Sequence, residues 1–197
     1  MKIEMANLNT QEVHELLGGA VVPLPIAFIS TTGKDGTYNA APFSLVTPVS
    51  YKPPAICVSF GLRQGKKKDT LANIEATQDF VVNIMDETLI KPVAQAAEDY
   101  AVDVDEISEV GLTAIAAEKV KAPLIAEAQI SLECRLIQKL ELGEGETLRG
   151  IVLGEVLLVH IKDNLYANGK IDPSRLKAVG RLGNDSYCRT TDIFSTS

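Results

Sequence analysis

Two long hydrophobic segments in the second half of the chain restrict its fold more than any other feature. They cover 128–142, "AQISLECRLIQKLEL", and 149–163, "RGIVLGEVLLVHIKD", and a turn containing "GEGE" joins them. In the first segment, apolar residues recur at every second position, which is typical of a strand with one buried face. These residues are Ile130, Leu132, Cys134 and Leu136. The second segment has few polar residues, which is typical of a strand covered on both faces. We therefore predict that the two segments pair as antiparallel strands.

Strand signals recur along much of the remaining chain. A hairpin is predicted over 26–46, turning at "GKDG", and further strands over 53–61 and 79–85. Helical spacing of apolar residues occurs at 10–17, where Gly18 and Gly19 signal an end, at 69–78, and at 87–101, with an interruption at Pro92. Because strands dominate and often follow one another directly, we predict an antiparallel barrel with a few covering helices. Nothing marks a domain boundary, so we expect one domain over 1–197.

The charge of the chain restricts its partners. The 197 residues carry a formal net charge of −7, whereas binding to nucleic acid or to an anionic membrane requires a dominant positive surface. A bound anion must therefore be held by a local cluster of cations. The N-terminal sequence lacks a signal-peptide pattern and no apolar run reaches membrane-spanning length, so we expect a cytoplasmic protein. The three cysteines are widely spaced, and no CxxC pair or His/Cys cluster suggests a metal site.

Three consecutive lysines, Lys66 to Lys68, stand directly before the helix predicted at 69–78. Asp69 or Thr70 occupies the expected N-cap position. Since the start of a helix offers unpaired backbone N–H groups and a partial positive charge, a neighbouring lysine and a threonine hydroxyl would complete a seat for a phosphate group. A lysine-rich loop that is merely solvated is the alternative, and local sequence leaves both open.

A second stretch, 39–54, combines small residues, hydroxyl groups and four prolines. A strand end of this composition exposes backbone amides and hydroxyls on a stiff frame, which could hydrogen-bond a flat ring rich in heteroatoms. An ordinary strand with proline-limited ends is the alternative.

No conventional catalytic arrangement is present in the sequence. The two histidines are isolated: His14 lies on a predicted surface helix, and His160 ends a predicted strand. The sequence contains no GxSxG, HExxH, P-loop or GxGxxG motif. We assign no catalytic residue. If the protein is an enzyme, its reactive atoms are expected to belong to a bound cofactor.

Taken together, the motifs resemble the flavin reductase-like, FMN-binding split-barrel family, including its flavoredoxin-type members. The resemblance runs in order from about Pro23 to Thr190. The stretches that carry it are "PLPIAFISTTGKDGTYNAAPFSLVTPVSYKPP", "SFGLRQGKKKDTLANIEATQDFVVNI", "AEDYAVDVDEISEVGLT", "SLECRL", "GEVLLVHI" and "VGRLGNDSYCRT".

The resemblance implies a six-stranded antiparallel split barrel that forms a homodimer, with non-covalent FMN near the subunit interface. It also implies a set of FMN-binding residues. Beside the ring and ribityl chain these are Asn39, Ala41, Phe43, Ser44, Thr47 and Ser50, with Ser59 and Gly61 on the strand end over which the ring lies. Around the phosphate they are Lys68, Asp69, Thr70 and Asn73, and closing the pocket they are Arg181, Tyr187 and Arg189. Of the three lysines, Lys68 is expected to hold the phosphate.

The function that follows is an NAD(P)H-dependent flavin reductase, in which NADH or NADPH delivers a hydride to flavin N5. The alternative is a non-enzymatic FMN electron carrier reduced by a partner protein, for which the acidic surface would dock a basic redox partner. A third hypothesis is a split barrel that binds another planar ligand, such as haem with His160 as an axial ligand or a pyridoxal-type cofactor.

Overall fold

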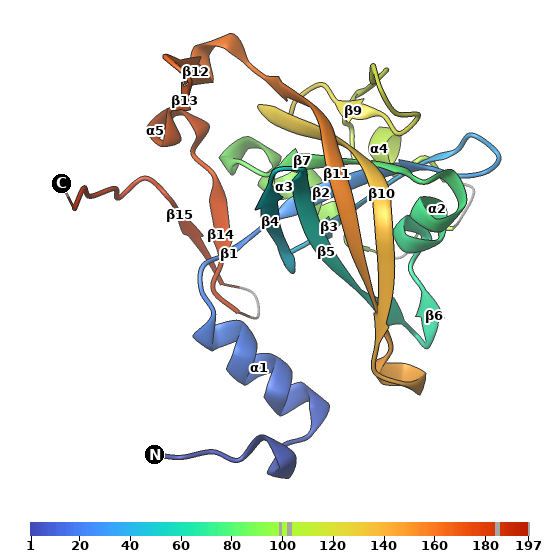
Figure 1. Cartoon of the computed structure of the whole chain (residues 1–197), viewed down its shortest axis with the longest axis vertical. Helices are drawn as coiled ribbons and strands as arrows, with labels where there is room; N and C mark the ends of the chain where they lie inside the picture. The colour runs from blue at the N-terminus through green and yellow to red at the C-terminus, as the bar shows by residue number, and fades with distance from the viewer. Residues whose placement is uncertain (99, 102–103, 184–185, 197) are drawn as a thin grey trace.

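The fold is built around one antiparallel sheet, as Figure 1 shows for a computed structural model that describes residues 1–98, 100–101, 104–183 and 186–196. The strands follow the order β3-β2-β7-β10-β11-β5-β4, and every neighbouring pair is antiparallel. Their bounds are β2 Ala27–Thr32, β3 Tyr38–Phe43, β4 Val46–Tyr51, β5 Pro54–Arg63, β7 Asp79–Ile84, β10 Ile130–Leu142 and β11 Arg149–Ile161. The predicted antiparallel, mainly β architecture is confirmed.

The number of strands differs from the expected six. Seven strands lie on the continuous path of the described sheet, and the two-residue strand β6, Lys66–Lys67, pairs with β5 off this path. The path begins with β3 and ends with β4, which are consecutive in sequence and are separated only by Ser44 and Leu45. The sheet is therefore open between these two strands.

The remaining elements are short and lie around this sheet. The helices are η1 Met5–Asn7, α1 Thr10–Ala20, α2 Asp69–Thr77, η2 Glu87–Leu89, α3 Ile90–Gln95, α4 Glu106–Glu109, η3 Gly145–Thr147, η4 Asp163–Leu165 and α5 Pro173–Leu176. The strands are β1 Leu24–Pro25, β8 Ala114–Ile115, β9 Leu124–Ile125, β12 Tyr166–Ala167, β13 Lys170–Ile171, β14 Val179–Arg181 and β15 Tyr187–Arg189. Within the described part of the chain, no helix has the length and apolar character needed to span a membrane.

The predicted pairing of the two long segments is confirmed. β10 and β11 pair from Ile130 opposite Ile161 to Leu142 opposite Arg149, with two register shifts along the way. The expected coverage of β11 on both faces is not found in one chain. Val152 is fully buried, whereas Ile151 and its neighbour Leu153, which point to the opposite face, are only half-buried. One face of β11 therefore remains partly open.

The buried face of the sheet packs against α2. Leu71 and Ile74 of this helix join a core cluster that includes the fully buried rings of Phe60 and Phe80. Two glycines of β11 permit this packing. A Cβ atom on Gly150 would lie 2.6 Å from Leu71 Cδ2, and one on Gly154 would lie 2.4 Å from Phe80 Cζ. These glycines let the helix and the aromatic ring approach the strand.

A second core cluster lies under η2, α3 and α4. Phe28, Leu89 and Ile107 are almost completely buried in it. Ile107 belongs to α4, the four-residue helix that packs against β3. The burial of Ile107 therefore places its neighbour Glu106 against the backbone of β3.

Two helix boundaries differ from the sequence-based expectations. α1 continues through Gly18 and Gly19 to Ala20, with an Asn9–Glu12 capping box at its start and no buried residue. Figure 1 shows α1 projecting away from the sheet. Pro92 does not interrupt its helix, because it lies in the first turn of α3, where a proline removes no intrahelical hydrogen bond.

We predict that Gly154→Ala lowers the free energy of unfolding by about 1–3 kcal/mol, because the added methyl group overpacks the core against Phe80. Gly19→Ala is the matched control, since a Cβ atom there meets nothing within 4 Å and alanine favours helix. Urea denaturation of the three proteins measures the difference. Equal unfolding free energies for Gly154→Ala and the wild type would contradict this packing.

Candidate functional site

The start of α2 lacks a side-chain cap. Lys68 occupies the N-cap position with extended backbone angles and makes no capping hydrogen bond, and Asp69 is the first helical residue. The expected N-cap, Asp69 or Thr70, is therefore displaced by one residue or two. The first backbone N–H groups of a helix have no intrahelical partner, and the N-terminal end carries a partial positive charge. This helix end can receive an anion.

A cavity of about 460 Å³, which we call the basic cavity, lies beside this helix start. Five of the residues expected to bind FMN line it: Asn39, Ala41, Lys68, Asp69 and Thr70. Its lining also includes Arg63, whose guanidinium donates to the carbonyls of Ala97 and Glu98 at 3.2 and 3.3 Å. Lys68 and the helix start therefore border one cavity. That this cavity holds a phosphate stays a prediction.

The three lysines lie in different surroundings. Lys66 and Lys67 are both exposed, and Lys67 pairs with Glu75 at 2.9 Å. Lys68 is more buried, and its Nζ lies 4.9 Å from the centre of the Phe43 ring. Burial holds the pKa of Lys68 below its usual range, and the positive charges of Arg63 and Arg149 lower it further. A bound anion would relieve this repulsion between cations.

Asn39 connects the helix start to the sheet and to α4. Its Oδ1 accepts hydrogen bonds from the Thr70 hydroxyl at 2.9 Å and the Thr31 hydroxyl at 3.1 Å, and Asn73 donates to the same Thr31 hydroxyl at 3.1 Å. The Nδ2 of Asn39 donates to Glu106 Oε2 at 2.5 Å. Because the Thr70 hydroxyl donates to Asn39, the group that Thr70 offers at the helix start is its backbone N–H.

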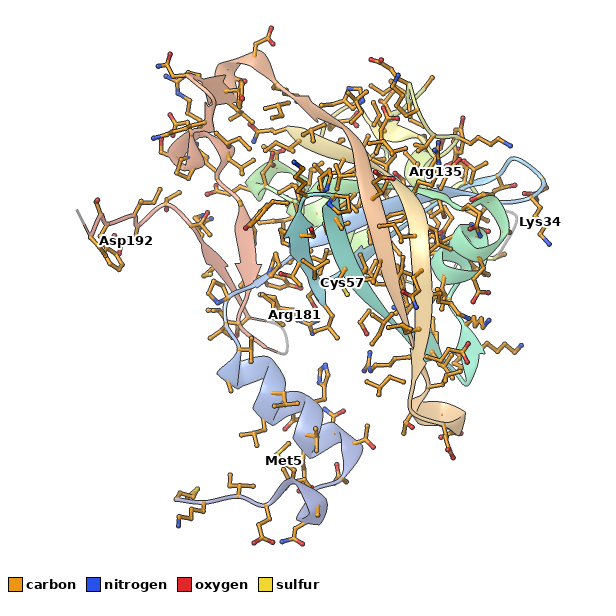
Figure 2. The ribbon with its side chains drawn as sticks, in the orientation of Figure 1. Met5, Lys34, Cys57, Arg135, Arg181 and Asp192 are labelled. Atoms are coloured by element: carbon orange, nitrogen blue, oxygen red, sulfur yellow. The ribbon has the colours of Figure 1, made fainter. Side chains whose placement is uncertain are left out.

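A second cavity, of about 710 Å³, which we call the open cavity, adjoins the first. Both cavities are lined by Pro42, Leu62 and Lys68. Further residues expected to bind FMN line the open cavity, namely Phe43, Ser44, Ser59, Gly61 and Arg181. α1 contributes to it as well, and Figure 2 shows Arg181 between α1 and the sheet. The two cavities are therefore adjoining compartments that share Lys68.

Arg149 reaches the open cavity across a glycine. It is the first residue of β11 and lies opposite Gly61 of β5 in the strand register. A Cβ atom on Gly61 would lie 3.0 Å from Nη1 of Arg149, so the absence of a side chain leaves room for the guanidinium. This glycine also leaves the backbone of β5 accessible from the cavity.

Five of the expected residues do not line either compartment. Asn73 lines a third cavity, of about 570 Å³, on the other side of Asn39 and Asp69. The Ser50 hydroxyl accepts from the backbone N–H of Lys52 at 3.2 Å, and Arg189 pairs with Glu87 at 3.1 Å. Thr47 and Tyr187 are exposed. Flavin contacts by these five residues stay a prediction.

Some titratable residues that the sequence analysis did not assign to the site also line the two cavities, among them His14, Arg63, Glu106 and Arg149. Glu106 hydrogen-bonds Asn39 from 67 positions away, and Arg149 meets Gly61 through strand register, so neither has a local signal. His14 was identified only as a surface histidine. The other histidine, His160, lies 2.5 Å from Glu133 Oε1 and does not line either cavity.

Solved structures place the fold in a known class. The chain superposes with a TM-score of 0.86 on a flavin reductase with a split barrel domain from Shewanella frigidimarina, described as putative, at 21% identity and over 100% of this chain and 98% of the other. The TM-score is 0.95, at 31% identity, for nitrilotriacetate monooxygenase component B from Bacillus cereus, over 99% of this chain and 98% of the other. The fold is a split barrel of the flavin reductase type.

The sequence identifies the family. The flavin reductase like domain model matches residues 19–175, and the chain belongs to this family. An uncharacterized protein of Halalkalibacterium halodurans is 35% identical over 198 residues, which cover 99% of this chain and 95% of the relative. Membership of this family supports a flavin-related function.

Proposed function

We propose that this chain, folded as one domain, binds FMN non-covalently across the two cavities, with the phosphate in the basic cavity and the ring in the open cavity. The observation that carries the proposal is the gathering of Lys68, Arg63 and Arg149 beside the start of α2, which no side chain caps. Like charges repel, and in a chain of net charge −7 such a gathering is favourable where an anion neutralises it.

Each part of the site has a role in this binding mode. Lys68 and the first backbone N–H groups of α2 hold the phosphate. The hydroxyls of Ser44 and Ser59 offer hydrogen bonds to the ring, and Gly61 lets it approach the backbone of β5. Arg149 brings a cation to the open cavity, where it favours the negative charge that arrives with electrons.

When bound, the flavin supplies hydride acceptance at N5 from NADH or NADPH and passes electrons onward. The chain positions the flavin and provides the electrostatic surroundings. Hydride transfer needs no protein general base, which agrees with the absence of a conventional catalytic arrangement in the sequence. NAD(P)H-dependent flavin reduction is the activity that we propose.

The electron acceptor is proposed to be an oxygenase-type partner or free flavin that leaves after reduction. Support comes from the similarity to a monooxygenase component B, whose name describes one component of an enzyme. The alternative, a non-enzymatic FMN electron carrier, differs from this proposal only in the electron donor, because a partner protein would reduce the flavin in place of the nicotinamide.

We further propose that two copies pair through the outer face of the sheet. Ile151 of β11 lies opposite Ser59 of β5, and Leu153 lies opposite Cys57, so these side chains share the face that points away from the core. Leu140 of β10, which lies opposite Ile151, is 45% exposed. This apolar outer face adjoins the open cavity through Ser59, so a second copy would cover both.

We predict that Lys68→Ala weakens FMN binding by about tenfold to a hundredfold, because a charge-assisted hydrogen bond to the phosphate is lost. Lys66→Ala is the matched control from the same run of lysines and should change the dissociation constant less than about threefold. Flavin fluorescence titration at low salt measures both. Unchanged affinity in Lys68→Ala would place the phosphate elsewhere.

The donor is identified by mixing the FMN-loaded protein with NADH or NADPH without oxygen. We expect one of the two nicotinamides to bleach the visible flavin absorption, because the open cavity leaves the ring accessible. A spectrum that stays oxidised with both nicotinamides would refute the reductase proposal and favour the electron carrier. A protein that takes up no flavin would refute both.

For the pairing of two copies, we predict that light scattering returns a dimer for the wild type and a monomer for Leu153→Glu, because the new charge would be buried in the interface. Ile171→Glu is the control, since it adds the same charge at an exposed apolar residue of β13. A monomeric wild type at micromolar concentration would contradict the pairing.

A further inference from the structure

A buried carboxyl group faces the phosphate seat proposed above. Glu106 is only 8% exposed and lines the basic cavity together with Lys68, Asp69 and Thr70. Anion-binding sites ordinarily exclude carboxylates, because a carboxylate repels the ligand. Desolvation by burial raises the pKa of Glu106 to about 7, and the negative charge of Asp69 acts in the same direction. Near neutral pH, this group can therefore be present with or without its charge.

The hydrogen bonds of Glu106 connect it to the helix start. Its Oε2 accepts from the backbone N–H of Ala40 at 2.8 Å and from Asn39 Nδ2 at 2.5 Å. The Oδ1 of the same Asn39 accepts a hydrogen bond from the hydroxyl of Thr70, the second residue of α2. Since both N–H groups donate to Oε2, a proton can reside on Oε1 without breaking either hydrogen bond. Glu106 can therefore take up or lose a proton without losing these two hydrogen bonds.

Other charged groups act on Glu106 from the surrounding elements, within the described part of the chain. Asp69 of α2 raises the pKa of Glu106 and Arg63 of β5 lowers it. Desolvation raises the pKa of the Tyr100 phenol, and the negative charges of Glu98, Glu109 and Glu106 raise it further. Asp105 caps α4 by accepting from the N–H groups of Ile107 and Ser108. The other charged residues that line the basic cavity are the lysines 66–68. Glu106 also lines the third cavity, together with Lys34, Asp35 and Glu75.

We infer that Glu106 is an electrostatic gate on the phosphate seat: its ionised form weakens binding of the flavin phosphate, and a proton on Oε1 restores it. This inference rests on the proposed FMN site and adds a residue that controls how tightly the site holds its ligand. A flavin retained by neutral Glu106 is released more readily when the group ionises.

The direction of the pH dependence follows from the charges. Below about pH 7, Glu106 is largely neutral and binding is strongest; as the pH rises through this value, the carboxylate repels the phosphate and the dissociation constant increases. The second pKa of a phosphate monoester is about 6, so the phosphate itself is already mostly doubly charged in this range. Its own titration cannot produce a loss of affinity.

The experiment compares the dissociation constants of FMN at about pH 6.8 and pH 8.3 for the wild type, Glu106→Gln and Glu109→Gln. Glu109 is the matched control, because it is an exposed glutamate of the same helix. For a pKa of Glu106 that FMN raises by about one unit, wild-type binding weakens roughly fivefold over this interval. Glu109→Gln should follow the wild type, and Glu106→Gln should keep most of its affinity at pH 8.3. Riboflavin, which lacks the phosphate, should show no such loss.

Lys68 also has a lowered pKa and could lose its charge at high pH, but it is present in all three proteins. A loss of affinity that is equal in the wild type and Glu106→Gln would therefore overturn the gate and leave the proposed FMN site intact. Absence of FMN binding in every protein at both pH values would overturn the proposed function itself.

A second measurement needs no functional variant. Carboxyl ¹³C NMR of the wild-type protein follows the titration of Glu106 with and without FMN. We expect FMN to move the titration midpoint to higher pH, because a proton on Glu106 and a phosphate in the seat favour each other. An unchanged midpoint would overturn the gate, even if Glu106→Gln fails to fold.

Discussion

The register between β11 and β5 is the constraint on which both the core and the candidate site depend. Val152 opposite Val58 places two fully buried side chains on the inner face. In the same register, Arg149 lies opposite Gly61, and its guanidinium crosses the space that a side chain would fill. A shift by one residue would exchange the two faces of β11, which would expose Val152 and turn Arg149 into the core. The fold and the positive charge of the site are therefore fixed together.

Burial acts on two opposite charges at the basic cavity. Desolvation lowers the pKa of the Lys68 ammonium and raises that of the Glu106 carboxyl, so in each case it favours the uncharged form. The two groups nevertheless differ in what surrounds them. Lys68 has further cations near it, whereas Glu106 accepts two hydrogen bonds and has both Asp69 and Arg63 nearby. An anion in the cavity would stabilise charged Lys68 and neutral Glu106, which makes the site sensitive to both ligand and proton.

Local sequence predicted those parts of the structure that depend on neighbours in the chain. The strand at β10, the turn before β3 and the helix start after the lysines all follow from residues a few positions apart. The single buried face expected for β10 is not found, because Ser131 and Glu133, which lie between the apolar positions, are buried as well. The end of α1 was placed too early, since two glycines weaken a helix without ending it. Pro92 was read as an interruption because its place in the first turn of α3 depends on where that helix begins.

Contacts between residues far apart in the sequence could not be predicted, because no local pattern signals them. The bond between Asn39 and Glu106 requires the packing of α4 against β3, which the burial of Ile107 sets. Nothing near Glu106 in the sequence signals that its carboxyl becomes buried. The resemblance supplied ten of the residues that line the two cavities, because motifs retain the positions of a site even where local physics does not reveal them.

The open cavity is the part of the site that a single chain leaves least complete. The basic cavity is bounded by α2, β5 and the segment after α3, whereas the open cavity borders an outer face on which Ile151 and Leu153 remain half-buried. α1 lines this cavity without burying any of its own residues, so little apolar contact holds the helix there. A second copy on the outer face would bury these apolar side chains and enclose the ring compartment in one step. Flavin binding and pairing would then strengthen each other, because each removes water from the same surface.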